Sequence, residues 1–161
     1  MINSEIRPAL EAMRAMEFNK IKDDAIRAGI EKNFFILSDG RRELDKRIET
    51  LKDMFLSKFK AKKDGELGEE AIVEKLQGKL AVADGEDAKA ISRELLSHEK
   101  YFDEQSIMNR KIAELLKEPF TGFIPISREK LMEAMRGQEK FTLAWIDALY
   151  PILEQSKKEE K

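Results

Sequence analysis

The chain has 161 residues, of which 39% are charged and 42% apolar, with a formal net charge of −2. This composition favours long amphipathic helices in a single domain, 1–161, and its balanced charge gives no reason to expect a nucleic acid or an anionic membrane as partner. The sequence has no cysteine, which excludes disulfides and thiolate chemistry, and no run of about 20 apolar residues that could span a membrane. We therefore expect a soluble, cytoplasmic, all-α protein.

The first predicted element is a short helix over residues 4–16, within an N-terminal segment 1–18. Asn3 or Ser4 can accept hydrogen bonds from its first free amides, and Pro8 is tolerated in its opening turn. The helix has one apolar face, made of Ile6, Leu10, Met13 and Met16.

The next element is a long helix, for which Asn19 is the predicted cap. From residue 26 onward its apolar residues recur in steps of three, four or seven, the spacing of a coiled-coil-like helix. They are Ile26, Ile30, Phe34, Leu37, Leu44, Ile48, Leu51, Phe55 and Phe59. The pattern predicts one continuous apolar seam that faces a partner helix.

Ser38, Asp39 and Gly40 interrupt this long helix in composition but not in periodicity. A break capped by Asp39 is the alternative, yet the apolar phase matches on both sides, so we expect the helix to continue. Glycine costs a helix only about 1 kcal/mol relative to alanine, less than the burial of one large apolar side chain returns. Gly40 then marks a gentle bend or a place where another group packs closely.

Four lysines, Lys58, Lys60, Lys62 and Lys63, follow the seam. Positive charge is favourable at the negative end of a helix dipole, so we interpret them as a solvated C-terminal cap. A basic patch that binds phosphate or nucleic acid is the alternative, although nucleic acid is not the expected partner because no aromatic residue beyond Phe59 lies close enough for base stacking.

A connector, residues 64–87, contains one short helical pattern at 69–77 and ends at Asp84 and Gly85, which we interpret as capping the next helix rather than as a calcium loop. The next predicted helix covers 86–117. Its apolar positions are Ala88, Ile91, Leu95, Phe102, Ile112 and Leu116. Its length predicts that it lies antiparallel along the first long helix, so that residues 19–117 form a helical hairpin.

The C-terminal part, 118–156, begins with an extended apolar strap, because Pro119 and Pro125 forbid a helix there. Ser127 is placed to cap a helix that stops at Gly137, and Thr142 to cap a final helix that Pro151 kinks or ends. We expect this two-helix unit to pack back on the hairpin, and the tail 157–161 to be frayed.

Motifs for chemistry are missing from the sequence. His98 is the one histidine, and with Glu94 one turn before it we interpret it as part of a polar pair on the helix surface or seam. One histidine without cysteine makes a zinc or di-iron centre a poor expectation, and no phosphate-binding glycine loop or nucleophile motif occurs. We therefore expect no catalytic, metal-binding or cofactor-binding residues, no cofactor and no enzyme activity.

Several segments resemble a family of small helical bacteriophage and prophage proteins of unknown function, encoded among virion or tail-region genes. The resemblance rests on the stretches NSEIRPALEAM, IRAGIEKNFFILSDGRRELDKRIETL, IAELLKE, ISREKL and FTLAWIDALYPIL, in this order. It implies a phage or prophage origin, a location in the host cytoplasm or the virion, and a C-terminal unit that packs back on the hairpin.

The expected function is protein–protein contact, in virion assembly or as a minor structural component. Phe34, Phe35 and Ile36 are adjacent, so they cover more of the helix than one seam can bury, and some of this surface should meet the strap, the N-terminal helix or another subunit. With Trp145 and Tyr150 they form the candidate partner surface, although we expect Trp145 to pack in the core or the hairpin rather than to be an exposed anchor. The partner is a phage or host protein, or a second copy. The alternatives are an inhibitor or regulator of a host protein and a nucleic-acid-binding accessory protein. If the protein is an inhibitor, its decoy surface would be a set of acidic side chains: Glu66, Glu69, Glu70 and Glu74.

Overall fold

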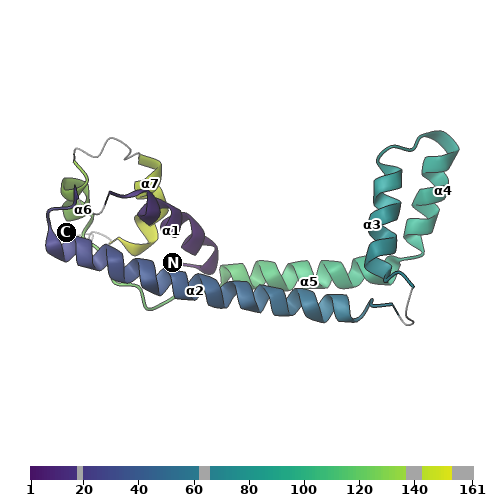
Figure 1. Ribbon diagram of the computed structural model, residues 1–161, viewed down its shortest axis with the longest axis horizontal. Coiled ribbons are helices and arrows are strands. Elements are labelled where there is room, and N and C mark those ends of the chain that lie inside the picture. The colour runs from purple at the N-terminus through teal and green to yellow at the C-terminus, as the bar shows by residue number, and fades with distance from the viewer. Residues whose placement is uncertain (18–19, 62–65, 137–142, 154–161) are drawn as a thin grey trace, which may run out of the picture. The chain divides into compact units, whose positions relative to one another are not determined.

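The computed structural model describes residues 1–17, 20–61, 66–136 and 143–153 (Figure 1). The elements are η1 (Asn3–Glu5), α1 (Ile6–Ala15), α2 (Asp24–Ser57), α3 (Glu69–Leu80), α4 (Gly85–Leu96), α5 (Glu99–Lys117), α6 (Arg128–Ala134), α7 (Leu143–Leu149) and η3 (Tyr150–Ile152). The predicted all-α class is confirmed: in the described ranges the only β-structure is a pair of isolated bridges, Ile2 with Pro119 and Ile126 with Leu153.

The chain divides into two compact units. We call residues 1–45 with 115–161 the terminal unit, and residues 46–114 the middle unit. Helices α2 and α5 each contribute to both units. The single domain expected from the chain length stays a prediction, because this division does not establish that either unit folds alone.

Helix α2 begins at Asp24 because Asp23 caps it. One carboxylate oxygen of Asp23 accepts hydrogen bonds from the amides of Ala25, at 2.9 Å, and Ile26, at 3.0 Å. This start is later than the cap predicted at Asn19, a residue that lies outside the described ranges. The helix then runs without a break through Ser38, Asp39 and Gly40, which confirms the continuity that the periodicity predicted.

The core of the terminal unit forms where α1, the first half of α2 and the C-terminal helices meet. The four residues that share the apolar face of α1 are buried, with no more than 5% exposure at any of them. The main buried residues that join it are Ile26, Ile30, Leu37, Ile126, Leu131, Met135, Ile146, Leu149, Ile152 and Leu153. Residues from both ends of the chain therefore share one core.

The start of the chain is tied by hydrogen bonds to the end of α5 and to the first residues of the strap. The capping of α1 predicted for Asn3 is not observed. Its side-chain amide donates to the carbonyl of Leu115, at 2.8 Å, and its backbone amide donates to the carbonyl of Glu118, at 3.0 Å. Glu5 instead accepts from the backbone amide of Ile2, at 2.7 Å. Asn3 is buried, so its amide stabilises the fold more by satisfying a distant carbonyl than by capping a local helix.

The strap, residues 118–127, is extended as its prolines predicted, and it is held to α2 by one side chain. The amide of Asn33 donates to the carbonyl of Ile124 and accepts from its backbone N–H, both at 2.7 Å. Gly122 has φ +97°, a left-handed conformation in which a side chain would be strained. Where the strap passes Gly40, the ring of Phe120 packs against the backbone of α2, so close packing accounts for this glycine.

Two of the predicted C-terminal helix signals are confirmed. The hydroxyl of Ser127 accepts a hydrogen bond from the amide of Lys130 at 3.5 Å and caps α6. Pro151 lies in η3, and α7 ends before it at Leu149. Gly137, Thr142 and the tail 157–161 lie outside the described residues, so the predictions made for them stay predictions.

In the middle unit the end of α2 lies antiparallel to α5 (Figure 1). The helix predicted over 86–117 is divided, however, into α4 and α5 by a turn at Ser97 and His98. Helix α4 lies beside α3. The prediction that Ala88 and Ile91 extend the hairpin along α2 is therefore wrong. The turn brings Leu95 against an aromatic cluster, and this burial outweighs the continuous helical pattern of the sequence.

The aromatic cluster holds the middle unit together. The ring of Tyr101 lies 5.1 Å from the rings of both Phe55 and Phe59, centroid to centroid, and 5.6 Å from that of Phe102. The pairs are tilted or edge-on, the arrangements that aromatic rings prefer. Val73 of α3 is buried against this cluster, so the rings connect three helices.

The stability of the middle unit is expected to fall at alkaline pH through Tyr101. Burial raises the pKa of its hydroxyl above the ordinary 10.0, and the nearby carboxylates of Glu70, Glu74 and Glu69 raise it further. The unfolded chain therefore releases this proton at a lower pH than the folded protein does, and the stability present below about pH 10 is lost as the pH rises toward the folded pKa.

Chemical denaturation at a series of alkaline pH values measures this loss. Tyr101→Phe should be less dependent on pH in the same window. A Tyr150→Phe variant leaves Tyr101 as the one tyrosine, so its tyrosinate absorbance reports its pKa directly. Titration of that signal at or below pH 10.0 would contradict the effect of burial.

Candidate interaction surfaces

Phe35 is the most exposed aromatic residue among those that the structure describes, with 67% of its surface open to solvent. It lies on α2, where its neighbours at helical spacing, Glu31, Lys32, Asp39 and Arg42, are charged and exposed. Asp39 and Arg42 form a surface salt bridge at 3.4 Å. These charged neighbours do not bury the ring of Phe35, so packing within the chain does not account for an apolar residue at this position. Phe35 is therefore a candidate contact point for another molecule.

Its neighbour Phe34 has a different environment. Phe34 is half-buried and packs against the core of the terminal unit, and the guanidinium of Arg14 lies 5.8 Å from the centre of its ring. The rings of Phe34 and Phe35 meet edge-on, 6.0 Å apart. The ring of Phe34 therefore contacts both the core of the terminal unit and the exposed ring of Phe35.

The five residues of the predicted partner surface differ in their exposure to solvent. Ile36 is half-buried, and Trp145 is half-buried against the core of the terminal unit. Tyr150 is 54% exposed, on the turn η3. Of the five, only Phe35 and Tyr150 are exposed.

The lysines after α2 are partly used within the chain. The ammonium of Lys58 donates to a carboxylate oxygen of Glu104 on α5 at 2.5 Å, and this hydrogen bond is the main reason that the pKa of Glu104 is lowered. Lys60 is exposed, while Lys62 and Lys63 lie outside the described residues. The pairing of Lys58 favours a structural role for this lysine over a phosphate contact.

A shallow groove between α2 and α5, which the sequence interpretation missed, lies on the middle unit. We call it the α2–α5 groove; its lining is Leu51, Met54, Phe55, Lys58, Glu104, Ile107, Met108 and Lys111. Met54 is 59% exposed and Ile107 is 38% exposed. The sequence does contain a pattern that indicates this groove. Each helix contributes residues at positions i, i+3, i+4 and i+7, which lie on one face of a helix.

His98 is paired, but with a different carboxylate from the one expected. Its Nδ1 lies 3.0 Å from a carboxylate oxygen of Glu69 on α3, rather than pairing with Glu94 of α4. Because His98 occupies the turn between α4 and α5, this contact joins the turn to the first residue of α3. Glu69 is therefore engaged within the fold, whereas Glu66 and Glu74 of the acidic set are exposed.

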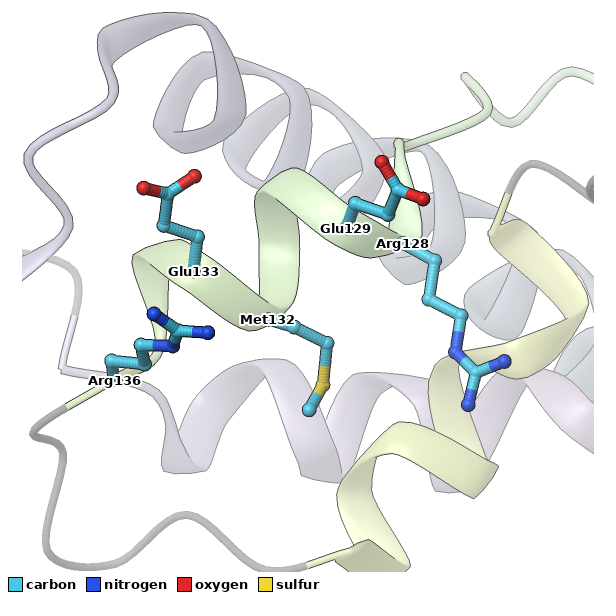
Figure 2. A pocket seen from close by; sticks show the side chains of 5 residues that line it. All are labelled: Arg128, Glu129, Met132, Glu133 and Arg136. Carbon is cyan, nitrogen blue, oxygen red and sulfur yellow. The ribbon is translucent and has the colours of Figure 1, made fainter.

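Helix α6 borders a hollow of about 530 Å³, lined by Arg128, Glu129, Met132, Glu133 and Arg136. Figure 2 shows these side chains spreading apart along the helix, with Arg128 and Glu129 at one end and Glu133 and Arg136 at the other. The two positive and two negative charges balance, and the groups do not converge on one point. This arrangement gives no cluster that could position a substrate or an ion.

In the described ranges, no three acidic or histidine side chains gather closely enough to hold a metal ion. Within these ranges there is also no helix with the length and apolar character that crossing a bilayer requires.

Comparison of the chain with protein-family models, with curated proteins and with solved structures finds no match.

Proposed function

We propose that this protein acts by binding another protein through the exposed ring of Phe35, as a component or assembly factor of a bacteriophage virion. The observation that supports the proposal is the position of Phe35, a largely exposed ring on the long helix α2 and in edge-on contact with the ring of Phe34. Aromatic side chains in such positions supply much of the binding energy of protein interfaces. The phage origin rests on the sequence resemblance alone.

Replacing Phe35 with serine is expected to weaken capture of the partner by at least about tenfold, because a buried aromatic anchor contributes 2 kcal/mol or more in an interface. The measurement is affinity capture of phage virion proteins from cells that carry the phage, with mass-spectrometric identification. Thermal unfolding should change little, since the ring is 67% exposed.

A matched control is Val82→Ser, which removes an apolar side chain that is 88% exposed in the middle unit. This variant should capture the partner as the unmodified protein does. Equal loss in both variants would mean that general surface stickiness, and not the Phe35 face, causes the binding.

A second candidate is an inhibitor or regulator of a host protein, which the negative charge of α3 favours. The carboxylates of Glu70, Glu74 and Glu69 are close enough to raise the pKa of Tyr101, so this end of the middle unit has a local negative field. Capture of a host protein that is lost on Glu66→Lys with Glu74→Lys, and retained in Phe35→Ser, would favour this function over a virion role.

A further inference from the structure

We propose that the α2–α5 groove is the docking surface for a second copy of this chain, arranged with two-fold symmetry and with equivalent helices antiparallel. The groove lies in the middle unit, whereas Phe35 lies in the terminal unit, so this inference is independent of the proposed function. Three properties of the groove support it: its apolar lining, its symmetry and its charges.

The lining is apolar along its middle and charged at its ends. Five of its eight side chains are apolar, and two of these five are methionines, which adapt their shape to a facing surface. Met54 and Ile107 stand at the surface with 59% and 38% exposure. Two helices side by side leave these residues open to water, and a second pair of helices placed on the groove would cover them.

The two helices present the same pattern in opposite directions. Residues 51, 54, 55 and 58 of α2 match residues 104, 107, 108 and 111 of α5 in spacing, each set covering two turns or about 10 Å. Consider a two-fold axis that runs across the middle of the groove, perpendicular to both helices. It places α2 against α2 of the second copy, and α5 against α5 of the second copy. Met54 then meets the same residue of the second copy, and Ile107 does likewise, as a self-complementary interface requires.

The charges favour this arrangement over the one in which equivalent helices run parallel. Glu104 lies at one end of the groove with Lys58, and Lys111 lies two turns away at the other end. Among the described residues Lys111 makes no salt bridge, although its charge helps to lower the pKa of Glu104 in its own chain. The antiparallel arrangement brings Lys111 to Glu104 of the second copy and leaves the Lys58 pair intact. The parallel one would place Lys111 against Leu51 of the second copy, without a carboxylate.

Sedimentation velocity over a range of concentrations tests the proposal on the full chain. The unmodified protein should show a reversible monomer–dimer equilibrium, and Met54→Glu or Ile107→Glu should each raise the dissociation constant by at least about a hundredfold, because each places two carboxylates in the apolar centre. Val82→Glu, a charge added at an exposed apolar position outside the groove, should leave the equilibrium unchanged.

A monomer at every concentration, or a dimer that both groove variants leave intact, would overturn the proposal. Far-UV circular dichroism and thermal unfolding of each variant separate a lost interface from a lost fold. Phe35→Ser should still dimerise, so failure of the proposed partner binding and failure of this inference give different results.

The symmetry is tested by mixing two charge variants. Lys111→Glu and Glu104→Lys should each dimerise about tenfold more weakly, because each places like charges opposite one another at two equivalent sites. A mixture of the two should form mixed dimers more strongly than either variant forms its own. Glu104→Lys also removes the Lys58 pair, so its unfolding midpoint is measured beside that of Lys111→Glu. If the mixture dimerises no better than the separate variants, the antiparallel arrangement is wrong.

Discussion

Gly40→Ala is expected to destabilise the protein by about 1–3 kcal/mol, although alanine is the better helix former. A Cβ atom at position 40 would lie 2.6 Å from Cζ and 3.3 Å from Cδ2 of the Phe120 ring. Contacts this close force the ring or the helix to move, and Phe120 packs against the core of the terminal unit. The free energy of unfolding in urea, monitored by circular dichroism, measures the effect.

A double-mutant cycle separates this clash from helix propensity. In a Phe120→Ala background the ring is gone, so Gly40→Ala should then stabilise the protein, by about 0.5–1 kcal/mol. Gly78→Ala in α3 is the matched control, because a Cβ there meets no atom within 4 Å, and it should stabilise in either background. Destabilisation by Gly40→Ala of the same size with and without Phe120 would show that the contact is not its cause.

Asn33→Leu should cost about 2–3 kcal/mol, because it removes both hydrogen bonds that join α2 to Ile124. The side chain of Asn33 is fully buried in the terminal unit, so leucine fits the apolar surroundings in size but leaves the N–H and the carbonyl of Ile124 without this partner. Hydrogen exchange at the Ile124 amide should speed up with the loss of stability. Asn109→Leu, at an exposed position of α5, should change the unfolding free energy by less than about 0.5 kcal/mol.

Asn33→Asp tests the donor and the acceptor separately. An ionised carboxylate still accepts from the N–H of Ile124 but repels its carbonyl oxygen, whereas a protonated carboxyl can donate to that oxygen. The variant should therefore be least stable at neutral pH and regain stability as acid protonates the new side chain. A pH-independent loss would mean that the hydrogen bond to the carbonyl contributes little.

Apolar periodicity predicted the buried faces well, because burial of one face is what selects the spacing of residues along a helix. The face of α1, the unbroken course of α2 and the close packing at Gly40 all follow from the sequence in this way. Caps were less predictable. Asn3 and Asp23 each have oxygen atoms that could cap, and only the fold decides that Asn3 binds the carbonyl of Leu115 instead.

The turn at Ser97 and His98 was not predictable from local pattern. Residues 86–117 contain neither glycine nor proline, and their apolar spacing suits one helix. The chain turns because α3 supplies partners that are distant in sequence: Glu69 for the His98 ring, and Val73 for the aromatic cluster that Leu95 also contacts. Such tertiary contacts override helix propensity, which is worth only tenths of a kcal/mol at each residue.

Two features could have been found from the sequence. Asn33 lies between Ile30 and Leu37 at seam spacing, and a polar residue on a buried face indicates a specific hydrogen-bond partner. The α2–α5 groove is visible as two helix faces of matching spacing, each with an adjacent apolar pair at its centre: Met54 and Phe55 on α2, and Ile107 and Met108 on α5. In contrast, the exposures of Phe35 and Phe34 differ because the strap and α1 cover only one side of α2, which periodicity could not reveal.

Site-specific photo-crosslinking at position 35 tests the proposed contact most directly. A benzophenone analogue of phenylalanine keeps an exposed aromatic ring at this position, and the same analogue at Val82, an exposed position in the middle unit, serves as the control. We expect a product with a virion protein, identified by mass spectrometry, from position 35 in cells that carry the phage, and a much weaker product from position 82. No crosslinked protein at position 35, or equal products at both positions, would contradict a specific contact through Phe35.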